Sequence, residues 1–219
     1  MGQARQLKAW TPRAVTVRDG SELLLRRLTP RDGANLEQAF ARLSEESRRL
    51  RFLTSKPRLT QSEVRYLTEV DGHQHEAIGA VDPATGQAVG VGRFVRDRER
   101  PERAEVAVTV VDEWQRRGVG TQLLEVLTDR AREEGITTFT ALVAADNDSM
   151  HRLLDRLGVS VHQIRPVGQA AEYEIELEPR GLGTRLHDAL RAAAEGYWRL
   201  PPRLLDALRA LVPVQLRGR

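Results

Sequence analysis

The stretch of sequence that most constrains this fold runs from Glu105 to Thr121 and reads EVAVTVVDEWQRRGVGT. It begins as a strand, in which one face carries Val106, Val108 and Val110 and the other carries Glu105, Ala107 and Thr109. It ends in a turn with two glycines, which opens a helix predicted over 118–134. The first N–H groups of a helix have no partner within it, and the helix dipole makes that end positive. We therefore expect an anion site, at which glycines let a diphosphate approach the backbone.

Several anion-binding motifs can be compared with this turn. A P-loop needs Gly-Lys followed by Ser or Thr, and the segment contains no lysine. A dinucleotide fingerprint needs a third glycine at position 123, which is Leu123, and it would also predict a parallel sheet. An ordinary strand-to-helix turn that begins with glycine is the remaining alternative.

The rest of the chain alternates between helical and extended patterns. Two short extended runs flank Asp19-Gly20, a hairpin signal. Helices are predicted at 30–43, 44–52, 61–70 and 147–157, and strands at 76–81, 87–95, 104–111, 137–144, 159–164 and 172–177. With 40% hydrophobic residues among 219, the chain can build a sizeable core. The order predicts an α+β fold with a mostly antiparallel central sheet and one β-α-β unit over 104–144.

The pattern Gln115-x-x-Gly118-x-Gly120 resembles the acyl-CoA pyrophosphate motif of the GNAT superfamily. The resemblance covers residues 15–178, and it looks closest to the bacterial Pat-like protein lysine acetyltransferases. The narrower likeness rests on Asp19-Gly20, on Ser44-Glu45-Glu46-Ser47 leading into Arg51-Phe52, on Ala104-Glu105, and on Asn147-Asp148-Ser149-Met150. It implies the GNAT fold, acetyl-CoA as the acyl donor, and an amine acceptor, which in Pat-like enzymes is a protein lysine.

The resemblance also implies which residues hold the cofactor. The backbone of Val110 and Val111 would pair with the pantetheine arm, and Arg116 and Arg117 would contact the 3′-phosphate. Asn147 would approach the pantetheine, although Asn is also a favoured helix N-cap. Backbone amides would hold the pyrophosphate, those of Gln115, Arg116, Arg117, Gly118, Val119, Gly120 and Thr121.

Glu105 is the candidate general base, since the Pat-like pattern has a Glu at this place on the strand. An amine of pKa about 10.4 is almost fully protonated at pH 7, so a nearby carboxylate helps to produce the free nucleophile. The alternative for Glu105 is an ordinary salt-bridged strand residue. Glu76 is the second candidate, because a neighbouring strand can face the same cleft.

One position departs from the family pattern. Many GNAT enzymes have a Tyr seven residues after the Asn as general acid, and here that position is Leu154. Neither Tyr66 nor Tyr173 can be placed there from sequence. His73 and His75 are weaker candidates for the acceptor site, as Phe52 is for a pocket wall. No two histidines have the spacing of a zinc helix motif, so no metal site is expected.

Both ends of the chain lie outside the resemblance. Residues 1–14 are expected to be a flexible segment. Residues 179–219 are expected to form a basic amphipathic helical extension, because residues 180–219 hold eight arginines against three acidic residues, with a leucine stripe broken at Pro201-Pro202. We expect this extension to pack on the domain or on a second protomer as a homodimer. Binding to an anionic membrane or to nucleic acid is a less favoured alternative.

The sequence has no cysteine and no apolar run of membrane-spanning length, and its first residues lack the apolar stretch of a signal peptide. It therefore predicts a cytoplasmic protein. Three functions stay open: acetylation of a protein lysine, acetylation of a small amine, and a non-catalytic acyl-CoA-binding or scaffold module. The Gly motif and Glu105 argue against the last.

Overall fold

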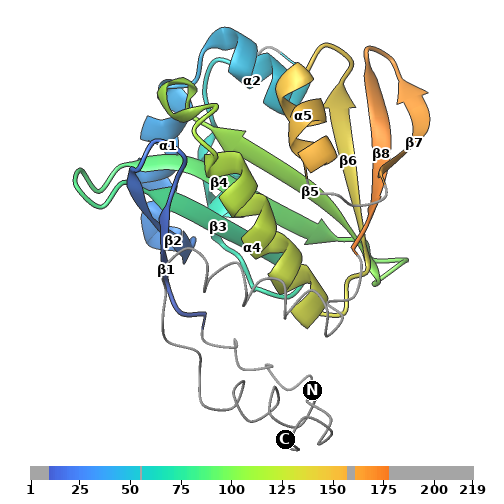
Figure 1. The fold of residues 1–219 in the computed structure, drawn as a ribbon, viewed down its shortest axis with the longest axis horizontal. Helices are drawn as coiled ribbons and strands as arrows, with labels where there is room; N and C mark the ends of the chain where they lie inside the picture. Colours follow the sequence, from blue (N-terminus) through green and yellow to red (C-terminus); the bar gives the residue numbers. More distant parts are fainter. Residues whose placement is uncertain (1–9, 55, 157–160, 178–219) are drawn as a thin grey trace, which may run out of the picture. The chain divides into compact units, whose positions relative to one another are not determined.

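The computed structural model describes residues 10–54, 56–156 and 161–177. These residues form an eight-stranded sheet with helices on both faces (Figure 1). The elements in chain order are β1 (Arg13–Thr16), β2 (Glu22–Arg27), η1 (Pro30–Asp32), α1 (Gly33–Ala41), α2 (Glu45–Phe52), α3 (Gln61–Thr68), β3 (His75–Val81), β4 (Ala88–Arg96), β5 (Arg103–Val110), η2 (Asp112–Trp114), α4 (Val119–Glu133), β6 (Thr138–Ala144), α5 (Asp148–Arg156), β7 (Val161–Val167) and β8 (Ala170–Glu176).

The strand order is β1-β2-β3-β4-β5-β6-β8-β7, and every neighbouring pair is antiparallel except β5 and β6. The predicted α+β class, the mostly antiparallel sheet and the single β-α-β unit are therefore confirmed. The first strand begins at Arg13, inside the segment that the sequence assigned to a flexible N-terminus. The predicted helical extension over 179–219 lies outside the described residues.

Local sequence signals explain where the helices begin. The hydroxyl of Thr60 accepts from the backbone N–H of Glu63, and the Glu63 carboxylate accepts from the Thr60 N–H, which is the predicted capping box of α3. The Ser44 hydroxyl caps α2 by accepting from the Ser47 N–H. Capping side chains satisfy N–H groups that have no partner within the helix, so they set the first residue of each helix.

Register decides which face each strand residue occupies. Phe94 pairs with Val106, and Gly92 pairs with Val108, on the face that α4 covers (Figure 1). A Cβ at Gly92 would lie 2.6 Å from Leu127 Cδ1 and 3.3 Å from Leu123 Cβ, so a larger residue there would force side chains of α4 to shift. The opposite face carries Glu105, Arg93 and Thr109, and α1, α2 and α3 pack on that side.

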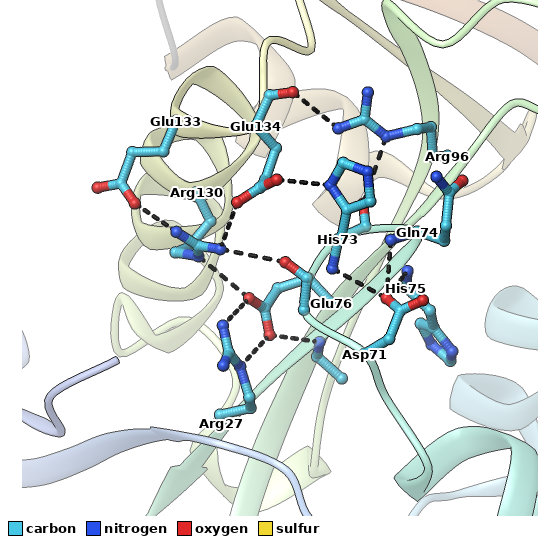
Figure 2. Close-up of polar contacts among 12 residues, drawn as sticks. Arg27, Asp71, His73, Gln74, His75, Glu76, Arg96, Arg130, Glu133 and Glu134 are labelled. Atoms are coloured by element: carbon cyan, nitrogen blue, oxygen red, sulfur yellow. Dashed lines mark hydrogen bonds and ion pairs between the residues drawn. The ribbon is translucent and has the colours of Figure 1, made fainter. Parts of the chain in front are cut away.

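A buried ionic network joins β2, β3 and α4 (Figure 2). The fully buried carboxylate of Glu76 accepts from Arg27 Nε at 2.8 Å, from Arg27 Nη2 at 2.6 Å and from Arg130 Nε at 3.1 Å. Arg130 also bonds Glu133 and Glu134 near the C-terminal end of α4. Removing one arginine partner of such a buried carboxylate is costly, because it leaves a buried charge without compensation.

Candidate active site

A cleft of about 630 Å³ opens beside β5. The strands β5 and β6 pair only at their first residues, where Arg103, Ala104 and Glu105 face Thr138, Phe139 and Thr140. Beyond Glu105 they diverge, and residues of both strands line the cleft, Val106 to Val110 on one side and Ala141 to Val143 on the other. Beyond Glu105 the edge of β5 that faces β6 has no strand partner there, so it can accept an extended ligand, as an exposed sheet edge does.

The turn before α4 forms one end of this cleft. Gly118 has a φ of +99°, a conformation that favours glycine. Arg116, two residues earlier, also has a positive φ of 63°. Within α4 the first internal hydrogen bond runs from the Gln122 N–H to the Gly118 carbonyl, at 3.1 Å. The N–H groups of the first turn therefore have no partner within the helix and point beyond its N-terminus. Gly118, Gly120 and Thr121 line the cleft at this end. This geometry fits an anionic group such as a pyrophosphate.

Gln115 fixes the loop that leads into this turn. Its side-chain amide donates to the Val110 carbonyl and to the Ser47 hydroxyl, both at 3.1 Å. Asp112 accepts from the Ser44 N–H at 2.9 Å and from the Ser47 hydroxyl at 2.9 Å. The N-terminus of α2 is therefore held against the loop after β5, which places α2 along one wall of the cleft.

The structure brings most of the predicted site residues together. The cleft is lined by Glu105, Val110, Gln115, Arg116, Gly118, Gly120, Thr121 and Asn147. Asn147 also caps α5, since its side-chain oxygen accepts from the Met150 N–H at 3.1 Å. Both roles weighed for this asparagine are thus compatible with its position.

Three predicted cofactor residues have side chains elsewhere. Val111 is 2% exposed and Val119 is 1% exposed, and both belong to the core. The Arg117 guanidinium lies 3.1 Å from Asp19 and stacks over the Trp114 ring. These side chains do not line the cleft.

Other residues line the cleft without a signal in the sequence. Arg18 reaches it from the β1–β2 hairpin, which is fixed because the Arg18 N–H donates to the Arg117 carbonyl at 2.9 Å. Leu53 and Leu142 line it as large exposed apolar side chains. Arg18 is about a hundred residues from the Gly turn in sequence, so only the fold reveals their proximity.

The structure places Glu76, His73 and His75 away from the cleft. Glu76 lies on the α4 face in the buried network, opposite to Glu105, so it cannot face the same cleft. His73 contacts Glu134 at 2.6 Å, as Figure 2 shows, and neither His73 nor His75 lines the cleft. Tyr66 and Tyr173 do not line it either, whereas Phe52 does and also packs on Phe40.

The backbone of Leu154 lies in α5. Over the described residues, no group of three or more metal-binding side chains is found. No helix in that part of the chain is long and apolar enough to cross a membrane.

Comparison with known proteins places this architecture in a family. Residues 39–159 match the model of the acetyltransferase (GNAT) family. Acetyltransferase Pat of Mycolicibacterium smegmatis is 36% identical over 149 residues, which cover 68% of this chain and 44% of Pat. Acetyltransferase PA5475 of Pseudomonas aeruginosa is 30% identical over 142 residues, which cover 64% of this chain and 76% of that protein.

Solved structures agree with the sequence matches. The GNAT domain of S. lividans PAT superimposes with a TM-score of 0.70 at 29% identity, covering 75% of this chain and 96% of that one. The chain spans less than half the length of the M. smegmatis relative. GNAT acetyltransferases use acetyl-CoA as the acyl donor and an amine as the acceptor, and the outward-facing amides at Gly118 and Gly120 fit the pyrophosphate of that donor. The chain belongs to the acetyltransferase (GNAT) family and resembles its Pat members.

Proposed function

We propose that this protein transfers an acetyl group from acetyl-CoA to the side-chain amine of a protein lysine, with Glu105 as general base. The observation that carries the proposal is the shared cleft. An exposed carboxylate, Glu105, lies where β5 and β6 begin to diverge, and the anion-binding turn at Gly118 and Gly120 lines the same cleft. A reacting amine and the acyl donor can therefore meet beside a proton acceptor.

The residues that would hold acetyl-CoA follow from their positions. The amides of Gly118, Gly120 and Thr121 would bind the pyrophosphate. Arg18 and Arg116 also line the cleft, and the bond from the Arg18 N–H to the Arg117 carbonyl holds Arg18 beside the turn, so both arginines would neutralise phosphate charge. The pantetheine would lie between the diverging strands, where Val110 and Asn147 line the cleft.

Glu105 would supply the proton acceptor. The lysine ammonium loses a proton to the carboxylate, directly or through water, and the neutral nitrogen then attacks the thioester carbonyl carbon. The carbon–sulfur bond breaks, and CoA leaves as a thiolate. A thiolate is a stable leaving group, so a leucine at position 154 in place of a tyrosine does not prevent the reaction.

A lysine acceptor fits the opening of the cleft. Leu53 and Leu142 are 38% and 42% exposed, so they offer apolar surface to the aliphatic stem of a lysine. The likeness to Pat proteins favours the same class of acceptor.

Acetyl transfer to a panel of acceptors tests this proposal. Initial rates would be measured with acetyl-CoA and lysine-containing peptides, folded proteins, polyamines and free amino acids, and acetylated lysines would be located by mass spectrometry. We expect the highest kcat/KM for lysine in a peptide or protein, and a fall in the rate with Glu105→Gln. A preference for polyamines or amino acids would favour the small-amine enzyme. Tight acetyl-CoA binding without transfer to any acceptor would favour the non-catalytic module.

A further inference from the structure

A second, smaller cavity of about 60 Å³ lies on the Glu105 side of the sheet, between the strands and the helices α1, α2 and α3. Most of its lining is apolar, with Leu36, Phe40 and Leu67 among the side chains. The cavity and the cleft have three lining residues in common, Arg51, Phe52 and Thr109. These three residues therefore lie where the cavity and the cleft adjoin.

Arg51 lies at this boundary without an ion-pair partner among the described residues. It belongs to α2 and is half-buried, and the structure shows no hydrogen bond or ion pair from its guanidinium to any other described residue. Its guanidinium carbon is 5.0 Å from the Phe52 ring centroid. Burial lowers the pKa of Arg51, and the charge of Glu105 opposes that shift only in part. An arginine has five N–H donors, so this group can still bind an acceptor.

Arg93 adds a second positive charge to the cavity. It is 5% exposed and donates to the Leu67 carbonyl at 3.2 Å and to His75 Nε2 at 3.1 Å. Burial, followed by the charge of Arg51, lowers the pKa of Arg93 to about 9. Neither acceptor is a carboxylate, because one is a backbone carbonyl and the other is an imidazole whose pKa burial lowers to about 4, so neither balances the charge of Arg93.

The third arginine of the cavity has a carboxylate partner, unlike Arg51 and Arg93. Arg26 forms a two-point ion pair with Asp32, at 2.9 and 2.5 Å, so its charge is balanced. No carboxylate of the described residues forms an ion pair with Arg51 or Arg93. Two like charges in an apolar setting repel each other and lose hydration, and an anion placed between them would offset both costs.

We propose that Arg51 and Arg93 form a subsite for a carboxylate of the substrate, reached from the cleft past Phe52. The volume fits this group, because one water needs about 10–15 Å³ of such space and a carboxylate occupies the place of a few waters. The planar fork of an arginine matches two carboxylate oxygens. The inference rests on the proposed function only for the position of the reacting groups in the cleft.

The carboxylate can come from either of two parts of the reaction. A short dicarboxylic acyl group on CoA would place its free carboxylate a few bonds beyond the thioester. An acidic residue next to the acceptor lysine would bring a carboxylate with the peptide. The chemistry of recognition is the same, so the experiment must separate the two sources.

Two matched pairs of ligands distinguish a carboxylate on the acyl group from a carboxylate on the peptide. Binding of succinyl-CoA and butyryl-CoA, which have the same chain length and differ in the terminal carboxylate, is measured by calorimetry. In the presence of CoA, binding is also measured for two peptides that carry Glu or Gln beside the lysine. One of the pairs should favour the carboxylate by about tenfold to a hundredfold, the range of a charged hydrogen bond.

Substitutions assign that preference to the subsite. Arg51→Met should bring the binding ratio close to one, and Arg51→Lys should retain part of it. Arg65→Met, at an exposed arginine of α3 that lines neither cavity nor cleft, should leave the ratio unchanged.

Equal binding within both pairs for the wild type would overturn the proposal. So would a ratio that survives Arg51→Met, or an equal weakening of all four ligands in that variant, which would show a structural role. Transfer to lysine is measured separately, so failure of the proposed function leaves these ratios interpretable.

Discussion

At the scale of single residues, two glutamates show how the side of the sheet determines chemistry. Glu105 and Glu76 lie on strands separated by β4, and both are plausible bases when the sequence is considered alone. The register places Glu76 on the α4 face between Arg27 and Arg130, and Glu105 on the other face at the cleft. The valines of β5 predicted which of its residues share a face. The sequence did not predict how β3 and β5 each pair with β4, and this pairing decides which face of the sheet Glu76 occupies.

Replacement of Glu105 by Gln should therefore slow the reaction without weakening acetyl-CoA binding. We expect kcat/KM at pH 7 to fall by about 10²–10⁴, the usual contribution of a general base. The deficit should shrink as the pH approaches the pKa of the amine, because more of it is then neutral. The pH–rate profile of Glu105→Gln is compared with that of Glu176→Gln, an exposed glutamate of β8 outside the cleft. Parallel profiles for wild type and Glu105→Gln would rule out this role.

At the scale of elements, helices and strands with clear periodicity were predictable, and the cleft between them was not. The stripe of α4 and the capping box of α3 are local signals, and the structure confirms both elements. The cleft results from the divergence of β5 and β6 after Glu105, which depends on strand pairing far apart in sequence. The proposed subsite at Arg51 likewise depends on the packing of α2 against β5.

The contact of β3 with β4 predicts a pH dependence of stability. Arg93 Nη1 donates to His75 Nε2, which requires a neutral imidazole, and burial lowers the pKa of His75 from 6.5 to about 4. Between these values the unfolded chain binds more protons than the folded one, so stability is lost as the pH falls through this window. The loss should be on the order of 2–3 kcal/mol.

Denaturant unfolding between pH 7 and pH 4 measures this effect. Between these pH values the free energy of unfolding should fall by about 2–3 kcal/mol less in His75→Gln than in the wild type. In His162→Gln, at an exposed histidine, it should fall as much as in the wild type. Equal declines in wild type and His75→Gln would show that the buried imidazole does not contribute.

At the scale of the whole molecule, we propose that the chain binds acetyl-CoA at the turn before α4. A Cβ at Gly120 would lie 3.5 Å from Leu153 Cδ2, an ordinary contact, so Gly120→Ala should fit. The longer, negatively charged side chain of Gly120→Glu would occupy the cleft and repel the pyrophosphate. Titration calorimetry with acetyl-CoA on both variants, with melting temperatures to check folding, is the most direct test. We expect near wild-type affinity for Gly120→Ala and loss of binding for a folded Gly120→Glu. Wild-type affinity in Gly120→Glu would contradict it.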